Sequence, residues 1–343
     1  MWNRNRGILR FAAAAMAVLA AEATAQPALE GCARIDDNAA RLACYDTLAA
    51  REKRNASADT ASKRPQLLAS PVQAPSASEL EKRWELRPEL RQGTFKVLPY
   101  RPLYALVHAT SEINAAPNSP TRPFDVDDIE LDTVEAKLQL SFKSKLVQDA
   151  FGFNTDVWFG YTQQSYWQAA NERYSSPFRE TNYQPEAIVL QPIDFRVGGA
   201  NLRYATAAFV HESNGRGGAL SRSWNRLVGS VAFESGPWSL ELRPWLRVFD
   251  RTGDRDDNPD IEDYVGRGEL VASWRDHGHV VTLAGRHSLR SGDRSRGSLR
   301  VDWAFPLAGS LNGHLQLFHG YGENLIDYNH RQTMLGVGVS FFD

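Results

Sequence analysis

The sequence has no long apolar run and almost no net charge. Its 343 residues have a mean hydropathy of -0.43. Without apolar stretches of roughly 20 residues, the chain cannot form a bundle of transmembrane helices. A formal net charge of -2 provides no overall basic field, which argues against a nucleic-acid-binding protein.

Aromatic residues are plentiful, with 9 Trp, 11 Tyr and 16 Phe. That number argues against a disordered chain, which has little apolar surface to bury. Composition alone suits a soluble globular protein, but a transmembrane β-barrel gives the same averages because its strands alternate apolar and polar residues. The periodicity of each segment must therefore separate the two.

The first 25 residues have the features of a secretory signal peptide. Three arginines precede an alanine-rich apolar segment at 11–21, and Ala23-Thr24-Ala25 fits a small-x-small cleavage site. The alternative is a buried alanine-rich helix. A signal peptide over 1–25 predicts export to an oxidising compartment.

The only two cysteines, Cys32 and Cys44, are twelve positions apart. In one continuous helix they would be separated by about 18 Å, whereas a disulfide requires Cα atoms roughly 4.4–6.8 Å apart. Pairing therefore needs a turn, which Asp36-Asp37-Asn38 could supply. We expect a small cysteine-containing helical segment over 26–50, with the thiols either paired or free. Residues 51–79, rich in Ala, Ser, Pro and charge, predict a flexible linker before the main domain at 80–343.

Beyond the linker, apolar and polar residues alternate with a period of two. Leu240 and Leu242 share one face, and Glu241 and Arg243 share the other, which indicates a strand. About twelve such segments lie near 98–108, 134–145, 155–167, 184–191, 196–212, 224–234, 237–249, 262–274, 279–289, 296–304, 313–322 and 333–342.

The even number of strands, the signal peptide and the aromatic last strand favour an outer-membrane protein. The predicted fold class is all-β: a 12-stranded antiparallel transmembrane β-barrel with a short N-terminal periplasmic extension. A soluble, secreted β-sandwich esterase is the alternative fold. In a barrel, the apolar face would contact lipid and the polar face would line the interior.

Three residues could form a hydrolytic site. His211 and Ser213 lie two apart, so on a strand they share a face, with Cα atoms about 6.7 Å apart, and supply a base and a nucleophile. Asn225 follows after a turn and could orient the imidazole from the neighbouring strand, as an acid does in a Ser-His-Asp triad. All three share parity with apolar residues such as Phe209 and Leu227. On a barrel they would face lipid and could attack only a substrate that the membrane delivers, such as a lipid ester. The alternative is that a His-x-Ser spacing arises by chance.

Two blocks resemble the bacterial outer membrane phospholipase A family, and the resemblance covers roughly 80–343. One runs from Tyr161 to Gln168 and on through Ser175-Ser176-Pro177-Phe178-Arg179-Glu180-Thr181-Asn182-Tyr183-Gln184-Pro185-Glu186. The other is His211-x-Ser213-Asn214-Gly215-Arg216 followed by Ser221-Arg222-Ser223-Trp224-Asn225-Arg226. The resemblance implies a twelve-stranded barrel in the bacterial outer membrane that hydrolyses acyl esters of phospholipids and lysophospholipids (A1/A2 activity). It also implies activation by Ca²⁺ and activity as a homodimer.

The resemblance assigns roles to individual residues as well. Ser213 would be the nucleophile, His211 the base and Asn225 the orienting residue. Calcium would be held near the nucleophile by the Ser221 hydroxyl, the Arg216 carbonyl and the carbonyl of the partner subunit's Ser175. Such oxygen-only ligands suit a hard cation. The loop 216–220 has no acidic residue, which puts any additional calcium site in doubt.

Gln163 shares parity with apolar neighbours and is therefore a polar group on the predicted lipid face, which is costly unless paired. The resemblance places it at the dimer interface; alternatively, it meets water at the membrane boundary.

A loop with four aspartates could bind a cation, although a solvated loop is favoured: Asp254, Asp256, Asp257 and Asp260. A non-catalytic porin or structural barrel is the alternative to an enzyme.

Overall fold

The computed structural model describes residues 31–61, 77–124, 130–150, 152–173, 178–250 and 252–341. The expected signal peptide over 1–25 lies outside them. The chain divides into two compact units, Met1–Ser76 and Ala77–Asp343. None of the described helices is both long and apolar enough to cross a membrane.

The N-terminal unit contains helix α3 (Asn38–Ala61) and a disulfide. Cys32 and Cys44 are bonded, with Cα atoms 5.6 Å apart, and the chain turns between them where Asp37 Oδ1 accepts the Ala40 N–H at 2.8 Å. The expectation of a linker from residue 51 is wrong for 51–61, which continue α3. No proline or glycine interrupts this stretch, so nothing in it breaks the helix. Residues 62–76 of the expected linker lie outside the described part.

Helix α4 (Glu79–Trp84) begins the second unit with a reciprocal cap. Ser78 Oγ accepts the Glu81 N–H, and the Glu81 carboxylate accepts the Ser78 N–H at 2.8 Å. The helix buries Trp84, and the Lys143 ammonium lies 3.5 Å from the centroid of the Trp84 ring. Three more aromatic rings pack edge-on against it: Tyr100, Trp158 and Tyr204.

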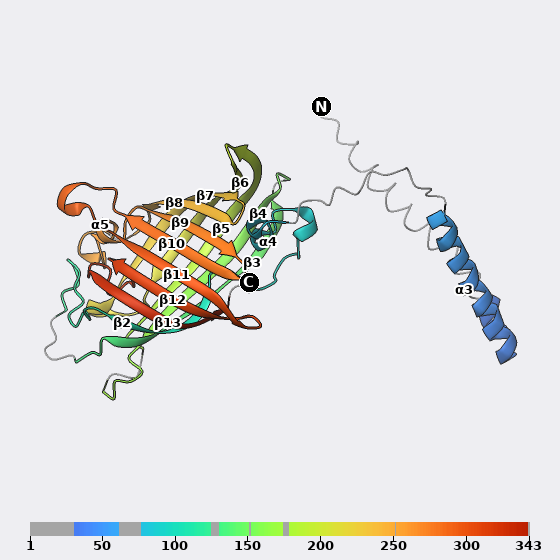
Figure 1. Cartoon of the computed structure of the whole chain (residues 1–343), viewed down its shortest axis with the longest axis horizontal. Helices are drawn as coiled ribbons and strands as arrows, with labels where there is room; N and C mark the ends of the chain where they lie inside the picture. Colours follow the sequence, from blue (N-terminus) through green and yellow to red (C-terminus); the bar gives the residue numbers. More distant parts are fainter. Residues whose placement is uncertain are drawn as a thin grey trace, which may run out of the picture. The chain divides into compact units, whose positions relative to one another are not determined.

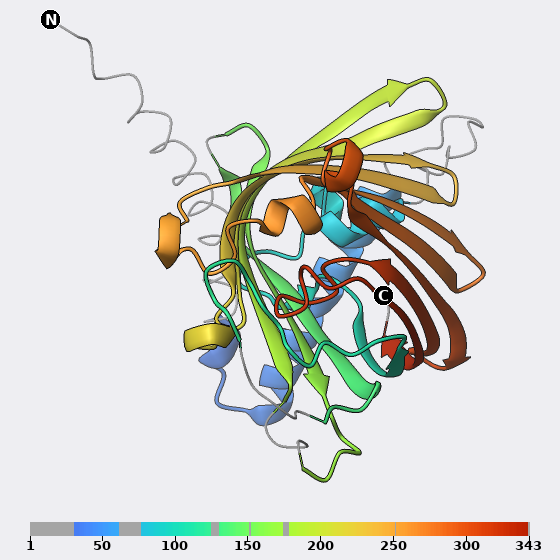
Figure 2. The same ribbon diagram turned by 90° about the vertical axis from the view of Figure 1, so that its left-hand side faces the viewer.

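Beyond the 3₁₀ turn η1 (Pro88–Leu90) and the short strand β1 (Leu98–Pro99), twelve antiparallel strands form a closed barrel (Figures 1 and 2). Each pairs with its neighbours in sequence, and β2 pairs with the last strand to close the ring. The strands are β2 (Leu103–Thr110), β3 (Val134–Ala150), β4 (Thr155–Trp167), β5 (Glu180–Val197), β6 (Ala200–Ser213), β7 (Ser223–Ser235), β8 (Trp238–Arg247), β9 (Gly268–Asp276), β10 (His279–His287), β11 (Gly297–Ala308), β12 (Leu311–Gly320) and β13 (Gln332–Phe341).

The predicted fold class is confirmed, and three of the differences from the expected segments have a clear local cause. The expected first strand at 98–108 is divided into β1 and β2, because Pro99 and Pro102 lack the N–H that a continuous ladder requires. Residues 196–197 belong to β5, and the chain reverses at Gly198-Gly199, where Gly198 has a φ of 58°. The start of the segment expected at 262–274 is taken up by helix α5 (Ile261–Tyr264).

The two ends of the barrel differ in their connections. At one end, two-residue turns join β5 to β6, β7 to β8, β9 to β10 and β11 to β12, and α4 packs near these turns. The opposite end carries the longer loops and α5 (Figure 1). In bacterial outer-membrane barrels the short turns are periplasmic and the long loops extracellular.

The alternation predicted from the sequence separates the two faces of the barrel wall. Large apolar side chains are exposed on the outside, among them Leu240, Leu242, Leu270, Leu283, Leu299 and Trp303. Charged side chains are buried in the interior, among them Lys137, Lys143, Lys145, Glu186 and Asp302. The interior is not entirely polar, because the aromatic cluster around Trp84 fills part of it. The closed barrel rules out the β-sandwich alternative.

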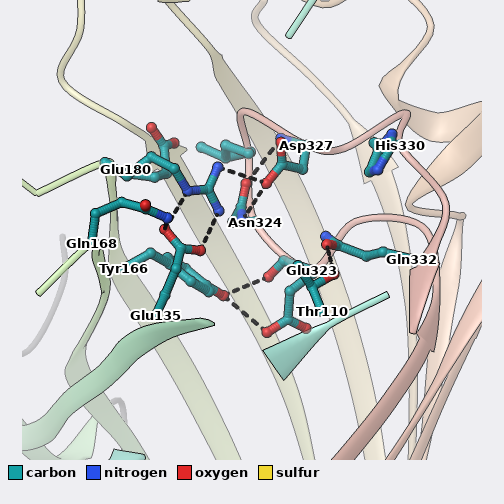
Figure 3. Close-up of polar contacts among 12 residues, drawn as sticks. Thr110, Glu135, Tyr166, Gln168, Glu180, Glu323, Asn324, Asp327, His330 and Gln332 are labelled. Atoms are coloured by element: carbon teal, nitrogen blue, oxygen red, sulfur yellow. Dashed lines mark hydrogen bonds and ion pairs between the residues drawn. The ribbon is translucent and has the colours of Figure 1, made fainter. Parts of the chain in front are cut away.

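Near the long-loop end, the interior is filled by a hydrogen-bonded polar cluster (Figure 3). The Arg179 guanidinium contacts both Glu135 and Asp327, the latter at 3.0 Å. The Tyr166 hydroxyl donates to the Glu323 carbonyl at 2.9 Å. Side chains from distant parts of the chain therefore tie the loop that precedes β13 to the barrel wall.

Candidate active site

The pairing of β6 with β7 brings two of the predicted catalytic residues face to face. His211 lies directly opposite Asn225 in the ladder, and its Nδ1 is 2.8 Å from Asn225 Oδ1. Both side chains are on the outer face, since Val210 and Trp224 beside them are buried in the interior. The sequence pattern predicts that His211 and Asn225 lie on the same face of the sheet. The pairing of β6 with β7 brings the two side chains into contact.

Ser213 ends β6 on the same outer face, two residues beyond His211. Its backbone neighbours are Tyr183 on β5 and Ser223 on β7. Among the described residues, no hydrogen bond joins the Ser213 hydroxyl to His211. Catalytic hydrogen bonds are often long in the absence of substrate and tighten when it binds. The structure therefore brings the three residues together, without a hydrogen bond between Ser213 and His211, the predicted nucleophile and base.

The loop after Ser213 is held by Asn214, which is buried. Its Oδ1 accepts the Arg222 N–H at 3.0 Å, and its Nδ2 donates to the Leu220 carbonyl at 2.8 Å. The chain turns at Gly215, where φ is 65° and an added Cβ would lie 3.2 Å from the Tyr183 ring. A glycine is required there. These hydrogen bonds hold the backbone that follows Ser213.

Two of the three predicted calcium ligands lie on this braced loop, and the third, Ser175, lies outside the described residues. The Ser221 hydroxyl donates to Asp257 Oδ2 at 2.7 Å, which leaves its lone pairs available. The Arg216 guanidinium is turned toward the Phe178 carbonyl and Glu180. The Ser221 hydroxyl, the Arg216 carbonyl and the Asp257 carboxylate are all oxygen ligands, the kind that a hard cation prefers. The described residues include no cluster of three or more His, Cys, Asp or Glu that could hold a metal.

Three of the four aspartates considered as a cation site, in the loop between β8 and β9, make ion pairs or hydrogen bonds, whereas Asp254 is exposed. Asp256 accepts from Arg247 at 2.7 Å and Asp257 pairs with Arg122 at 2.7 Å. Asp260 accepts the Tyr328 hydroxyl. Burial, together with this hydrogen bond, raises the pKa of that hydroxyl well above its usual value. These carboxylates fasten the loop beside the site.

A fourth polar residue at the site was not found from the sequence. Asp250 Oδ1 accepts hydrogen bonds from the backbone N–H and the Nδ2 of Asn225, at 2.9 and 2.6 Å. The available signal was its position, because Asp250 comes just after the strand that pairs with the one carrying Asn225. A period-two pattern describes faces of strands and carries no information about where a loop residue folds back.

Gln163 lies on the outer face of β4, as its parity predicts. Its Oε1 accepts the Tyr161 hydroxyl at 3.0 Å, and its Nε2 donates to Ser165 at 3.3 Å. It lines a groove of about 350 Å³, together with apolar side chains that include Leu140 and Phe341. The amide is therefore paired within its own strand, beside an apolar hollow.

Comparison with known proteins shows which family the chain is similar to. Residues 80–341 match the family model described as Phospholipase A1. Phospholipase A1 of Escherichia coli K12 is 36% identical over 73% of this chain and 82% of its own length. A relative from Neisseria meningitidis is 36% identical over 94% of this chain and 93% of its own, so that match extends beyond the barrel.

Solved structures agree. The outer membrane phospholipase A of Escherichia coli is 34% identical, with a TM-score of 0.64, covering 74% of this chain and 94% of that one. The outer membrane phospholipase of Salmonella typhi, solved as a dimer with bound calcium, is 34% identical, with a TM-score of 0.65, covering 75% and 95%. These matches identify an enzyme rather than a non-catalytic porin. The chain therefore belongs to the phospholipase A1 family, as a phospholipase built on an outer-membrane β-barrel.

Proposed function

We propose that this chain hydrolyses acyl ester bonds of phospholipids and lysophospholipids through Ser213, His211 and Asn225. The observation that carries the proposal is the 2.8 Å contact between His211 Nδ1 and Asn225 Oδ1 beside a serine on the outer face of the barrel. A site on that face meets lipid rather than dissolved substrate. An ester of a membrane lipid is therefore the substrate class that fits.

The residues divide the chemistry as follows. Ser213 Oγ attacks the ester carbonyl while His211 Nε2 takes its proton; the carbon–oxygen ester bond then breaks, and the leaving alcohol receives that proton. Water, deprotonated by His211, next attacks the acyl carbon; the bond to Ser213 Oγ breaks, the proton passes from His211 to that oxygen, and the fatty acid is released. Asn225 Oδ1 accepts the Nδ1–H throughout, which keeps Nε2 free to act as the base.

Calcium is part of the proposal. A bound ion would stabilise the negative charge that develops on the carbonyl oxygen. Of this chain's own residues, the Ser221 hydroxyl and the Arg216 carbonyl would hold it, because both lie on the loop that Asn214 braces directly after the nucleophile. The partner subunit's Ser175 would complete the set.

Activity as a homodimer follows from the same ligand set, since one ligand would come from a second copy. Support comes from the relative of Salmonella typhi, whose structure is a dimer with bound calcium. Gln163, beside an apolar groove on the outer face, is the residue that we assign to the interface.

The test measures fatty acid release from micellar phosphatidylethanolamine by wild type, Ser213→Ala and Ser235→Ala, with calcium or with a chelator. Ser235 is the last residue of β7, ten positions along that strand from Asn225, which lies opposite His211, so it controls for loss of any serine. We expect activity only in wild type and Ser235→Ala, and only with calcium. Equal activity in Ser213→Ala and wild type would overturn the mechanism, and activity that persists in chelator would overturn the role of calcium.

A further inference from the structure

Asp250 makes two hydrogen bonds to one residue of the proposed triad. Its Oδ1 accepts the backbone N–H of Asn225 at 2.9 Å and the side-chain Nδ2–H of the same residue at 2.6 Å. A carboxylate only accepts, so the group facing Asp250 must be the NH₂ end of the Asn225 amide. The carbonyl end is thereby directed at His211.

The local backbone explains why an acceptor is needed here. The register of β7 with β8 ends at Arg226 opposite Arg247, and one further bond follows, from the Val248 N–H to the Asn225 carbonyl at 2.9 Å. The strand then stops, which leaves the Asn225 N–H without a partner from the ladder. Phe249 takes a φ of 56°, uncommon for a bulky residue, and the turn brings the next side chain back over Asn225.

Asp250 is itself held in place. Its second carboxylate oxygen accepts from Arg247 Nε. The same guanidinium donates to Asp256 Oδ1 at 2.7 Å and to the Asn258 carbonyl at 3.1 Å. Only 13% of the Asp250 side chain is exposed. A chain of paired groups therefore runs from the loop through Asp250 to the amide that contacts the imidazole.

We infer that Asp250 is a positioning residue, the fourth member of a Ser213–His211–Asn225–Asp250 relay, which fixes the orientation of the Asn225 amide and thereby the tautomer of His211. The inference rests on the proposed function. If the amide turned over, its NH₂ group would face Nδ1, and the proton would have to move to Nε2, the nitrogen that must accept from Ser213. In a Ser-His-Asp triad the aspartate carries the negative charge that stabilises the imidazolium, and Asn225 is neutral. The Asp250 carboxylate next to Asn225 supplies that charge instead.

A purely structural role is the competing explanation, in which Asp250 only caps the end of the β7–β8 ladder. The two explanations differ in what they require. Capping needs an acceptor for the Asn225 backbone N–H and predicts a loss of stability. Positioning acts through the Asn225 side chain, so its effect on turnover must vanish once that side chain is removed.

The experiment compares Asp250→Ala, Asp250→Asn, Asn225→Ala and the double variant Asn225→Ala/Asp250→Ala on micellar phosphatidylethanolamine with calcium. Asp254→Ala, an exposed carboxylate in the same loop, is the matched control. Folding is checked by the heat-dependent gel migration of the barrel. Ser213→Ala is assayed alongside, because its activity tests the proposed function independently of Asp250.

We expect Asp250→Ala to lower kcat by about 10- to 100-fold with KM unchanged, because Asp250 does not touch substrate. Asp250→Asn, which retains a carbonyl acceptor, should lose less than about 10-fold. The double variant should match Asn225→Ala within about 2-fold. Independent losses that multiply in the double variant, or a folded Asp250→Ala with wild-type kcat, would overturn the positioning role while leaving Ser213 as nucleophile. Full activity in Ser213→Ala would instead overturn the proposed function itself.

Discussion

The inner and outer faces of β6 and β7 use polar residues in opposite ways. On the inner face, Glu212 accepts from Trp224 Nε1 at 3.0 Å and from Arg226 at 2.6 Å, and the Arg226 guanidinium stacks over the Trp224 ring. On the outer face, the His211 imidazole makes one hydrogen bond within the part of the chain that the structure describes, through Nδ1 to Asn225, and none to Ser213. Residues that alternate along the same two strands therefore pair with one another on the inner side and form the proposed catalytic site on the outer side.

The difference follows from what each group must do. A buried charge without a partner is costly, so inward polar groups are paired as fully as the geometry allows. A nucleophile and a base must leave the side that meets the substrate free. Only contacts on their other sides can therefore hold these side chains in position. The proposed outer-face site accordingly has Asp250 and Arg247 hydrogen-bonded in series behind Asn225.

The largest expected effect is on activity, from a substitution on the outer face alone. His211→Ala should lower fatty acid release by at least about 10³-fold, because the base is lost. The barrel should stay folded, since the imidazole lies on the face opposite the buried Val210 and Trp224. Phospholipid hydrolysis and heat-dependent gel migration measure the two quantities. Unfolding of this variant would contradict the separation of the two faces.

The next effect is on stability, from a substitution in the interior at the short-turn end of the barrel. Trp84→Ala should lower the free energy of unfolding by about 3–5 kcal/mol, because Trp84 packs against three aromatic rings and the Lys143 ammonium. Activity per folded molecule should be unchanged. Urea titration followed by gel migration measures stability. Trp238→Ala is the control, because Trp238 lies on the outer face and is 56% exposed, and it should change stability much less.

A smaller effect tests the inner face directly behind the site. Glu212→Gln keeps the shape but removes the charge that Arg226 and Trp224 use, so unfolding should become easier by about 1.5–3 kcal/mol. The kcat of the folded fraction should remain within a few-fold of wild type. A loss of turnover as large as that of His211→Ala would show that the two faces are coupled rather than separate.

The smallest expected effect concerns the proposed dimer. Gln163→Ala should weaken self-association by about 3-fold, which is the usual size of one polar contact inside a membrane. Gln164→Ala is the matched control, because its amide donates to Tyr104 and Gln139 within the same barrel. Cross-linking at a series of protein-to-detergent ratios measures the shift. Equal weakening by both variants would remove Gln163 from the interface.

Much of the fold could be predicted because strand periodicity is local. A period of two places Ser213 and His211 on one face whatever the rest of the chain does, and it gave all twelve barrel strands. Boundaries were less predictable where another local preference intervened, as at Pro102 or Gly198-Gly199. The linker failed at 51–61 because composition rich in alanine and charge also suits a helix.

The sequence by itself determined which residues face lipid, which face the interior, and which three carry the candidate chemistry. Only the tertiary structure decided that Asn225 stands opposite His211, that Asp250 reaches behind it, and that Trp84 fills one end of the barrel. The physical reason is that face depends on backbone geometry between adjacent residues. Register, the return of a loop and interior packing depend on contacts between residues that are farther apart in the chain, which an alternation between adjacent residues does not specify.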